Sequence, residues 1–370
     1  MEPRPALESL ACRHPECKDF GQAGRNNLKV RKIYGQDRIR YLRCRSCGQE
    51  FSERKGTALF NCKIGEAKAA SVIEHLDEGN RVSSTAYLVK VHKDTVRRLL
   101  RQSGRVSRQL HDRLVRGLRP RALQFDEKWS YTGKKRRHCR AEERETMGDH
   151  WDVNGIDPVT KLMVTVLPGA RTAQTISAAV ADAAGRLVPQ APPPAIFTDG
   201  EESYPAAILH SFGHWYTPSR TTHLGRPPAP KVRVPQDLVY AQIVKHRSGN
   251  RVVRVEIRPV FGKTKLAQVV TGLGWNQANT SAVERFNLTD RLRNSRKVRK
   301  TLAFSKNRHD HDAQTWISVL RYNFHHCHRS LRLKSATGRY QHRTPAMAAG
   351  LISTPCSTLH LLRLCPDGLG

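Results

Sequence analysis

The sequence is poor in acidic residues, in aromatic residues and in long apolar runs. Of its 370 residues, 32 are Asp or Glu against 64 Lys or Arg, and only 6% are aromatic. No apolar run approaches the roughly 18 residues that a membrane-spanning helix needs. The N-terminal sequence from Met1 to Pro5 has no apolar segment of the kind that a secretory signal requires. These absences disfavour a membrane or secreted protein and predict a cytoplasmic, nucleoid-associated one.

The surplus of positive charge, formally +32, predicts an acidic partner. Nucleic acid is the leading candidate, because phosphate contacts supply most of the sequence-independent affinity of proteins that bind it. A ribosomal or other basic structural protein is the plain alternative. An anionic membrane is disfavoured, since no long amphipathic basic helix stands out. The length predicts two or three domains, and the hydrophobic content of 38% means that the core is shared among small units or carries a polar surface.

Two close cysteine pairs flank a basic stretch near the N-terminus: Cys12, Cys17, Cys44 and Cys47. In a reducing compartment, close pairs favour a metal over disulfides, and the stretch between them, residues 30–42, could form a hairpin. Four thiolates satisfy tetrahedral Zn²⁺, and such a closed site is structural. The alternatives are that His14 replaces one ligand or that the four cysteines are unrelated. Residues 1–62 are predicted to be a zinc ribbon that needs its metal to fold.

Residues 63–120 alternate short apolar helical stretches with basic residues. Three helices are expected, at residues 67–76, 84–90 and 92–101. On the third helix, Val96, Leu99 and Leu100 share one face. The opposite face carries four cations: Lys93, Arg97, Arg98 and Arg101. This pattern predicts a helix-turn-helix domain whose third helix enters the major groove with cations for the phosphates. A solvated amphipathic helix in a generic bundle is the alternative, although the dense basic stretch that follows favours nucleic acid.

From residue 121 the pattern changes to strands mixed with helices. The expected order is three strands, a helix capped by Thr172, a strand, a helix and a short strand, at residues 122–131, 150–156, 161–167, 173–187, 195–198, 204–212 and 214–216. Residues 218–275 are predicted to be a β-rich insertion, with a hairpin of residues 238–246 and 251–260 in which Pro259 indicates an edge strand. Helices are expected again at residues 281–303 and 311–330. The segment 121–345 is thus predicted to be one α/β domain with a mixed sheet, and residues 346–370 a C-terminal tail.

Three acidic residues stand out in this domain because of where they fall: Asp126, Asp199 and Glu284. Asp126 lies on the first strand, Asp199 closes the strand at residues 195–198, and Glu284 opens a helix. Mg²⁺ and Mn²⁺ prefer oxygen ligands, and a pair of such ions serves phosphodiester chemistry. Each residue also has a plainer interpretation. Either Asp126 or its neighbour Glu127 could face solvent, Asp199-Gly200 is a common turn signal, and Ser281-x-x-Glu284 matches a capping box.

Further polar residues follow Glu284 in a strongly basic stretch. Asn287 and Arg291 fall on the same helix face as Glu284 and, with Lys300, are predicted to contact DNA phosphates. Four residues of the predicted late helix could make similar contacts or lie at the surface: His325, His326, His328 and Arg329. A solvated basic face is the alternative for any one of them.

Several short motifs together give the chain a family resemblance. They are the cysteine knuckle with Phe51-Ser52 and Gly56-Thr57 behind it, the run from Asp126 to Tyr131, the run from Phe197 to Gly200, the run from Val283 to Asn287, and the run from Arg299 to Lys306. Over roughly residues 12–345 the chain resembles the DDE transposases of bacterial insertion sequences, in the insertion-sequence-one-like branch.

This resemblance implies a ribonuclease-H-like core in which Asp126, Asp199 and Glu284 hold two Mg²⁺ or Mn²⁺ ions. It also implies binding to the terminal inverted repeats of a mobile element, cleavage at the element ends, and joining of the freed 3′-hydroxyl to double-stranded target DNA. Because two ends must meet, a homodimer or larger assembly is expected. The alternatives are a structure-selective nuclease or resolvase, a DNA-binding regulator that uses only the first 120 or so residues, and an inactive copy of a transposase.

Overall fold

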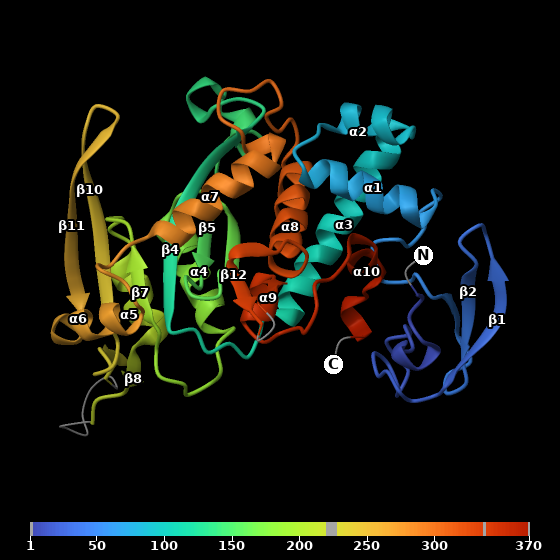
Figure 1. Ribbon diagram of the computed structural model, residues 1–370, viewed down its shortest axis with the longest axis horizontal. Helices are drawn as coiled ribbons and strands as arrows, with labels where there is room; N and C mark the ends of the chain where they lie inside the picture. The colour runs from blue at the N-terminus through green and yellow to red at the C-terminus, as the bar shows by residue number, and fades with distance from the viewer. Residues whose placement is uncertain (1–2, 220–227, 336–337, 369–370) are drawn as a thin grey trace. The chain divides into compact units, whose positions relative to one another are not determined.

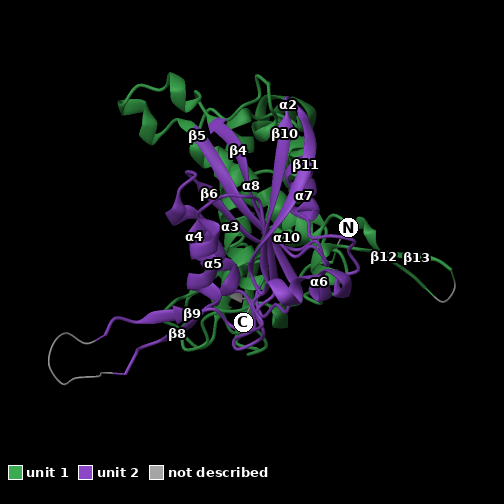
Figure 2. Ribbon diagram, turned by 90° about the vertical axis from the view of Figure 1, so that its left-hand side faces the viewer, with its two compact units in different colours: residues 1–115, 132–148, 290–370 green, residues 116–131, 149–289 purple. Residues whose placement is uncertain are grey.

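The computed structural model describes residues 3–219, 228–335 and 338–368 (Figure 1). The chain forms two compact units, each assembled from separate stretches of sequence (Figure 2). Unit 1 comprises Met1–Val115, Thr132–Gly148 and Asp290–Gly370, and unit 2 comprises Arg116–Tyr131 and Asp149–Thr289. These units do not follow the predicted segment boundaries, because the two N-terminal segments form one unit with the C-terminal part of the chain. No helix within the described ranges is long and apolar enough to cross a membrane.

Unit 2 is built on a mixed sheet of six strands in the order β11-β10-β7-β4-β5-β6. The strands are β4 (Ala122–Thr132), β5 (Gly148–Ile156), β6 (Met163–Gly169), β7 (Ala195–Thr198), β10 (Tyr240–Ser248) and β11 (Arg251–Phe261). Strand β7 runs parallel to both β4 and β10, whereas β5 pairs with β6 and β10 pairs with β11 in antiparallel fashion. The predicted α/β class with a mixed sheet is therefore confirmed.

The prediction of an insertion at residues 218–275 is wrong for its hairpin, because that hairpin extends the main sheet. Tyr240 pairs with Ile196 and Gln242 with Thr198, so β10 lies directly beside β7. The first half of β10 is buried, as expected for an interior strand, whereas β11 is largely exposed at the sheet edge, as Pro259 predicted. The passage also supplies β9 (Lys231–Arg233), which pairs with β8 (His214–Tyr216), and helix α6 (Lys263–Gly272). Of its Pro-rich part, residues 220–227 lie outside the described residues.

Helices cover both faces of this sheet. They are α4 (Ala173–Ala184), α5 (Tyr204–Phe212), α6 and α7 (Ser281–Arg293). Successive side chains of a strand point to opposite faces. Phe125 on β4 packs against Tyr204 of α5, whereas the adjacent Gln124 bonds to the start of α7, so α5 and α7 lie on opposite faces (Figure 2). Helix α4 begins as predicted, since the Thr172 side chain accepts a hydrogen bond from the Thr175 N–H (3.2 Å).

Unit 1 contains a small antiparallel sheet and a group of helices. The sheet has three strands in the order β1-β2-β3, namely β1 (Leu28–Tyr34), β2 (Ile39–Cys44) and β3 (Glu50–Ser52). The main helices are α1 (Glu66–Asp77), α2 (Val82–Val89), α3 (Lys93–Leu114) and α8 (Arg308–Phe324). Helices α3 and α8 pack closely at Gly104, where an added Cβ would lie 2.4 Å from Ala313 Cα. The N-terminal hairpin and the first two helices are thus where the sequence predicted them, whereas the third helix, predicted to end at residue 101, continues to Leu114.

Three further predicted elements also differ from the structure. Helix α7 stops at Arg293 instead of continuing to residue 303, because Asn294 leaves helical geometry and its side chain caps a short turn that follows. The late helix stops at Phe324, and His328 begins strand β12 (His328–Lys334), which pairs with β13 (Tyr340–Arg343). The predicted tail is partly helical, with α9 (Pro345–Ala348) and α10 (Thr358–Arg363), and Arg363 of α10 pairs with Glu66 of α1.

Candidate catalytic site and metal-binding cluster

Sheet pairing brings the first two acidic residues side by side. Strands β4 and β7 pair in parallel, with Gln124 opposite Phe197. Continued by two residues, the same register sets Asp126 opposite Asp199, which follows the last residue of β7. Neighbouring strands lie about 4.8 Å apart. The predicted positions on a strand and at a strand end therefore become adjacent carboxylates in unit 2.

Gln124 positions the helix that carries the third acidic residue. Its side-chain oxygen accepts hydrogen bonds from the N–H groups of Ala282 (2.9 Å) and Val283 (3.1 Å), which are free donors at a helix start. Gln124 precedes Asp126 by two residues and so points to the same face of the sheet. The first turn of α7, with Glu284, is thereby attached to the face onto which Asp126 projects. A buried Gln in a strand was the only sequence signal for this contact.

The pKa values indicate that the three carboxylates lie within electrostatic reach of one another. Burial raises the pKa of Asp126 to about 6, and the negative charges of Asp199 and Glu284 add to the effect. Burial also raises the pKa of Asp199, to which Glu284 contributes. Like charges that share a site disfavour ionisation, and a bound cation relieves this repulsion. The three residues lie near enough to influence one another's ionisation, and their role as metal ligands stays a prediction.

Glu284 is balanced by a lysine that the sequence did not single out. Its carboxylate accepts hydrogen bonds from Lys245 Nζ of β10 and from Thr280 Oγ1. Neither contact is to the Ser281 backbone, so the capping-box interpretation is wrong. Where the structure describes the chain, the groups of Cys, His, Asp and Glu whose ligand atoms all lie within 4.8 Å of one another do not include this triad. The three carboxylates form a loose group, and Lys245 pairs with Glu284, whose side chain is 42% exposed.

Asn287 supports Asp126 and does not face DNA, contrary to its predicted role. Its amide nitrogen donates to Asp126 Oδ2 (2.7 Å), and its oxygen accepts from Asn154 Nδ2 of β5 (2.6 Å). Asn287 is only 4% exposed and Asn154 is fully buried. This chain of two amides fixes the orientation of the Asp126 carboxylate. Asn154 was missed because a polar residue in a strand gives no sign of its partner.

We expect Asn287→Ala to lower any metal-dependent activity of this site by about 10- to 100-fold, the usual cost of removing a hydrogen-bond partner of a metal ligand. The reason is that Asp126 loses its fixed orientation. The measurement is the apparent Mg²⁺ or Mn²⁺ affinity of the purified protein, together with its activity. Leu288→Ala, an exposed position on the same helix, is the matched control. Equal metal affinity in the two variants would contradict a positioning role for Asn287.

Glu127 points to the opposite face of β4 and is engaged there. It accepts a hydrogen bond from Tyr204 Oη (2.5 Å) and pairs with Arg171 (3.2 Å), which also pairs with Glu201 (2.6 Å). Burial raises the pKa of Glu127 to about 7, and the charge of Asp199 adds to this. The interpretation that either Asp126 or Glu127 simply faces solvent is therefore wrong for both.

The four predicted cysteines of unit 1 form a compact cluster: Cys12, Cys17, Cys44 and Cys47. Their sulfur atoms all lie within 4.8 Å of one another, with 3.7 Å between Cys12 and Cys47 and 3.9 Å between Cys17 and Cys44. Burial raises the pKa of Cys12 and Cys17. Burial also acts on Cys44, but the backbone N–H groups of Cys47 and Ser46 outweigh it and lower the pKa of that thiol. His14 is not part of the cluster. Four sulfur donors in this arrangement could bind one metal ion.

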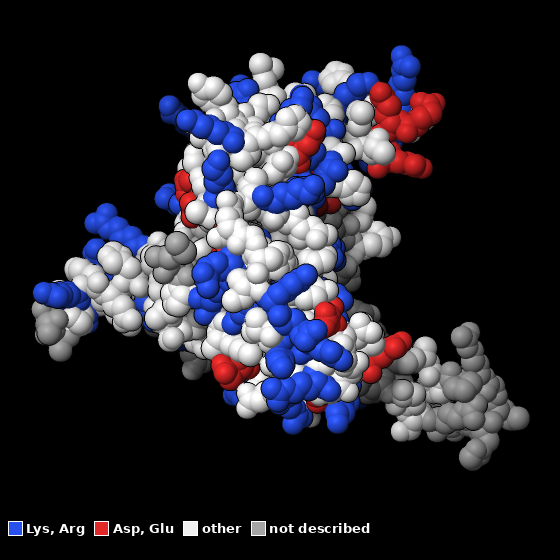
Figure 3. Space-filling model, turned by 90° about the vertical axis from the view of Figure 1, so that its right-hand side faces the viewer, with Lys and Arg blue, Asp and Glu red and all other residues white. Residues whose placement is uncertain are grey.

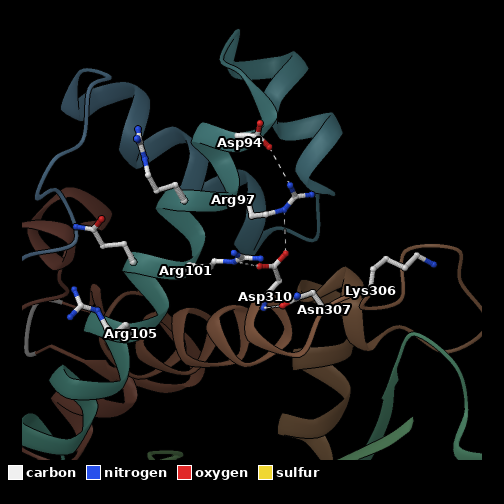
Figure 4. Close-up of a pocket in the computed structure, with 9 residues that line it drawn as sticks. Asp94, Arg97, Arg101, Arg105, Lys306, Asn307 and Asp310 are labelled. Carbon is white, nitrogen blue, oxygen red and sulfur yellow. Dashed lines mark hydrogen bonds and ion pairs between the residues drawn. The ribbon is translucent and has the colours of Figure 1, made fainter. Parts of the chain in front are cut away.

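The predicted inward face of α3 is confirmed, since Val96, Leu99 and Leu100 are all buried. On its outward face Lys93 and Arg98 are exposed, whereas Arg97 and Arg101 reach Asp310 of α8 (Figure 4). Lys and Arg side chains are spread over the face of the molecule shown in Figure 3, where Asp and Glu cover less of the surface.

The remaining predicted contact residues lie in unit 1. Arg291 is partly exposed near the end of α7, and Lys300 is exposed in the loop that follows. His326 is bonded to Asp77 (2.7 Å), so it is engaged within the protein, and Arg329 lies on β12.

Among the described residues, the carboxylates of Asp126, Asp199 and Glu284 in unit 2 offer oxygen ligands, and the thiol cluster in unit 1 offers sulfur ligands. Hard cations such as Mg²⁺ take oxygen ligands, and Zn²⁺ takes sulfur ligands. No protein-family model matches this chain, and no curated protein sequence matches it. Its function is therefore inferred from its own residues and contacts.

Proposed function

We propose that the protein is a DNA transposase of the DDE type, in the insertion-sequence-one-like branch, which cleaves the ends of a mobile element and joins them to target DNA. The observation that carries the proposal is the convergence of Asp126, Asp199 and Glu284 from β4, the end of β7 and α7. The order of the sheet also supports a ribonuclease-H-like core. Strands β4, β5 and β6 lie side by side, β7 and β10 continue the sheet parallel to β4, and helices lie on both faces.

The carboxylates fit divalent cations, because burial, and after it the charges of Asp199 and Glu284, raise the pKa of Asp126, and positive charge would relieve this. Two Mg²⁺ or Mn²⁺ ions, when bound, would supply charge neutralisation and activation of the attacking oxygen in an in-line displacement. The chain itself holds and orients these ligands, since Asn287 fixes Asp126 and Gln124 fixes the start of α7. Such chemistry depends on alignment and electrostatic stabilisation and needs no protein nucleophile.

Unit 1 provides the proposed DNA-binding parts. The four cysteines suit a structural Zn²⁺, which would make the N-terminal sheet a zinc ribbon. Helices α1 to α3 would form the helix-turn-helix, with Lys93 and Arg98 exposed for phosphate contacts. Binding two element ends at once would require a homodimer or larger assembly on DNA, and the protein would work on the nucleoid.

The test is a strand-transfer assay with the purified full chain. The substrate is DNA that carries the inverted repeats flanking the gene, mixed with a plasmid target and Mg²⁺. We expect cleavage at the element ends and a joined product, with neither formed in EDTA. Cleavage of branched DNA without joining would favour a structure-selective nuclease or resolvase. Metal-independent binding to the repeats with no cleavage would favour a DNA-binding regulator or an inactive copy.

A further inference from the structure

An open depression of about 820 Å³ lies in unit 1 between α3 and the start of α8 (Figure 4). Its lining includes five cationic side chains: Arg97, Arg98, Arg101, Arg105 and Lys306. Only two carboxylates, those of Asp94 and Asp310, line the same surface. The depression, called here the α3–α8 groove, therefore has a surplus of positive charge and is suited to an anionic ligand.

Asp310 holds two of these arginines in place. Its carboxylate pairs with Arg101 Nε (2.5 Å) and Arg97 Nε (3.4 Å), as Figure 4 shows, and its side chain is 6% exposed. The carboxylate is itself fixed, because Asp310 lies in the first turn of α8, where its N–H donates to the Asn307 side chain (3.2 Å). The Arg97 and Arg101 side chains still remain 42% and 47% exposed. The buried Asp310 carboxylate thus holds the guanidinium groups of Arg97 and Arg101 in place while both remain accessible to a ligand.

The spacing of the cations fits a strand of nucleic acid. Arg98, Arg101 and Arg105 recur every three or four residues along one side of α3, so they are neighbours on the helix surface. At about 1.5 Å of rise per residue, they span about 10 Å along the helix axis. A DNA strand carries one phosphate per about 3.4 Å of its axis, so this row could reach about three phosphates. An open groove suits such an extended backbone better than a small enclosed molecule.

We infer that the α3–α8 groove binds the phosphodiester backbone of DNA, and that Arg105 and Lys306 are contact residues in addition to those predicted from the sequence. The groove reads no bases, so its contribution is the same for every DNA sequence. Asp310 is a positioning residue that keeps Arg97 and Arg101 at the groove. The inference rests on the proposed function only in taking DNA as the partner of unit 1.

The test compares the salt dependence of DNA binding in two doubly substituted full-length proteins. One carries Arg105→Gln and Lys306→Gln, and the control carries Lys263→Gln and Lys334→Gln, exposed lysines of α6 and β12 that are outside the groove. Both pairs remove two positive charges. Each lost phosphate contact lowers the slope of log affinity against log salt by about 1. We expect the groove variant to lose about 2 from this slope, equally for unrelated duplexes, and the control to keep the wild-type slope.

Two outcomes would overturn the inference. One is an unchanged slope in the groove variant, and the other is a change seen with RNA but not with duplex DNA. Thermal unfolding of both variants checks that they are folded. Because binding is measured without Mg²⁺, the result is separate from the proposed catalysis. If the groove variant shows the expected slope but the wild-type protein makes no joined product, transposition alone is rejected. If joining is normal but the slope of the groove variant is unchanged, the groove alone is rejected.

Discussion

Replacing Asp126 by Asn should abolish Mg²⁺-dependent cleavage and joining, with a fall in rate of at least about a thousandfold. Asp199→Asn and Glu284→Gln should have effects of the same size. The reason is that a bound cation contributes several kcal/mol of charge stabilisation in the transition state, and each 1.4 kcal/mol, roughly, is a factor of ten. An amide has nearly the shape of the carboxylate but lacks the charge that holds the cation. The measurement is the single-turnover rate of end cleavage in Mg²⁺.

Asp126→Asn should leave the metal-free protein about as stable as the wild type. The folded-state pKa of Asp126 is raised from 3.8 to about 6, so at neutral pH its ionisation disfavours the folded state. This penalty is absent below the unfolded pKa, grows as the pH rises through the window between the two values, and is complete above about 6. Asp126→Asn removes the penalty but loses one of the two hydrogen bonds, from Asn287 or from the Glu127 N–H. Thermal unfolding in EDTA measures the balance.

Controls separate a lost ligand from a damaged fold. Mg²⁺ should raise the unfolding temperature of the wild type more than that of the variants, since a ligand stabilises the state that binds it. Affinity for element ends, measured without metal, should be retained because the proposed DNA-binding parts are in unit 1. Glu202→Gln, an exposed carboxylate three residues after Asp199, is the matched control and should keep full activity. A triad variant that joins DNA at a near-normal rate would remove that residue from the site.

The features that the sequence predicted correctly depend on local patterns. Cys12 and Cys17 are five residues apart and Cys44 and Cys47 three apart, and the cluster follows from those spacings with one hairpin between them. The strand that ends before Asp199 is a short apolar run closed by a turn signal. In each case the residues that define the element are neighbours in sequence.

The features that were missed depend on pairing between distant residues. Strand β10 lies next to β7 in the sheet although more than 40 residues separate them along the chain. Because the charged second half of β10 resembles an exposed hairpin, its buried first half was not recognised as an interior strand. Similarly, Asn287 resembles a surface residue of a basic helix, and only its contacts with Asp126 and Asn154 reveal its role. Polarity alone does not distinguish a buried, satisfied amide from an exposed one.

Cys44→Ser should release the metal from the N-terminal cluster and unfold the small sheet around it. The core of this sheet is one cluster in which three of the six buried residues are cysteines. The other three are Leu28, Leu42 and Phe51, and a few partly buried side chains pack against them. So small a core cannot hold the fold by itself. Structural zinc contributes on the order of 10 kcal/mol to the folding of small domains of this kind. We therefore expect the sheet to unfold when the metal is lost. We expect zinc content to fall from about one ion per chain to near zero.

The same variant should bind element ends at least about tenfold more weakly, because the ribbon would no longer present an ordered surface to DNA. Cys327→Ser is the matched control, since Cys327 is exposed and outside the cluster. Atomic absorption after dialysis measures the zinc, and amide hydrogen exchange locates the unfolding, which should be confined to the N-terminal sheet. Unchanged zinc content in Cys44→Ser would reject the ribbon. Zinc loss with unchanged DNA binding would keep the ribbon assignment but leave DNA recognition to α1–α3. Helix α3 has its own buried face and packs on α8 at Gly104, so it does not depend on the cysteine cluster for its packing.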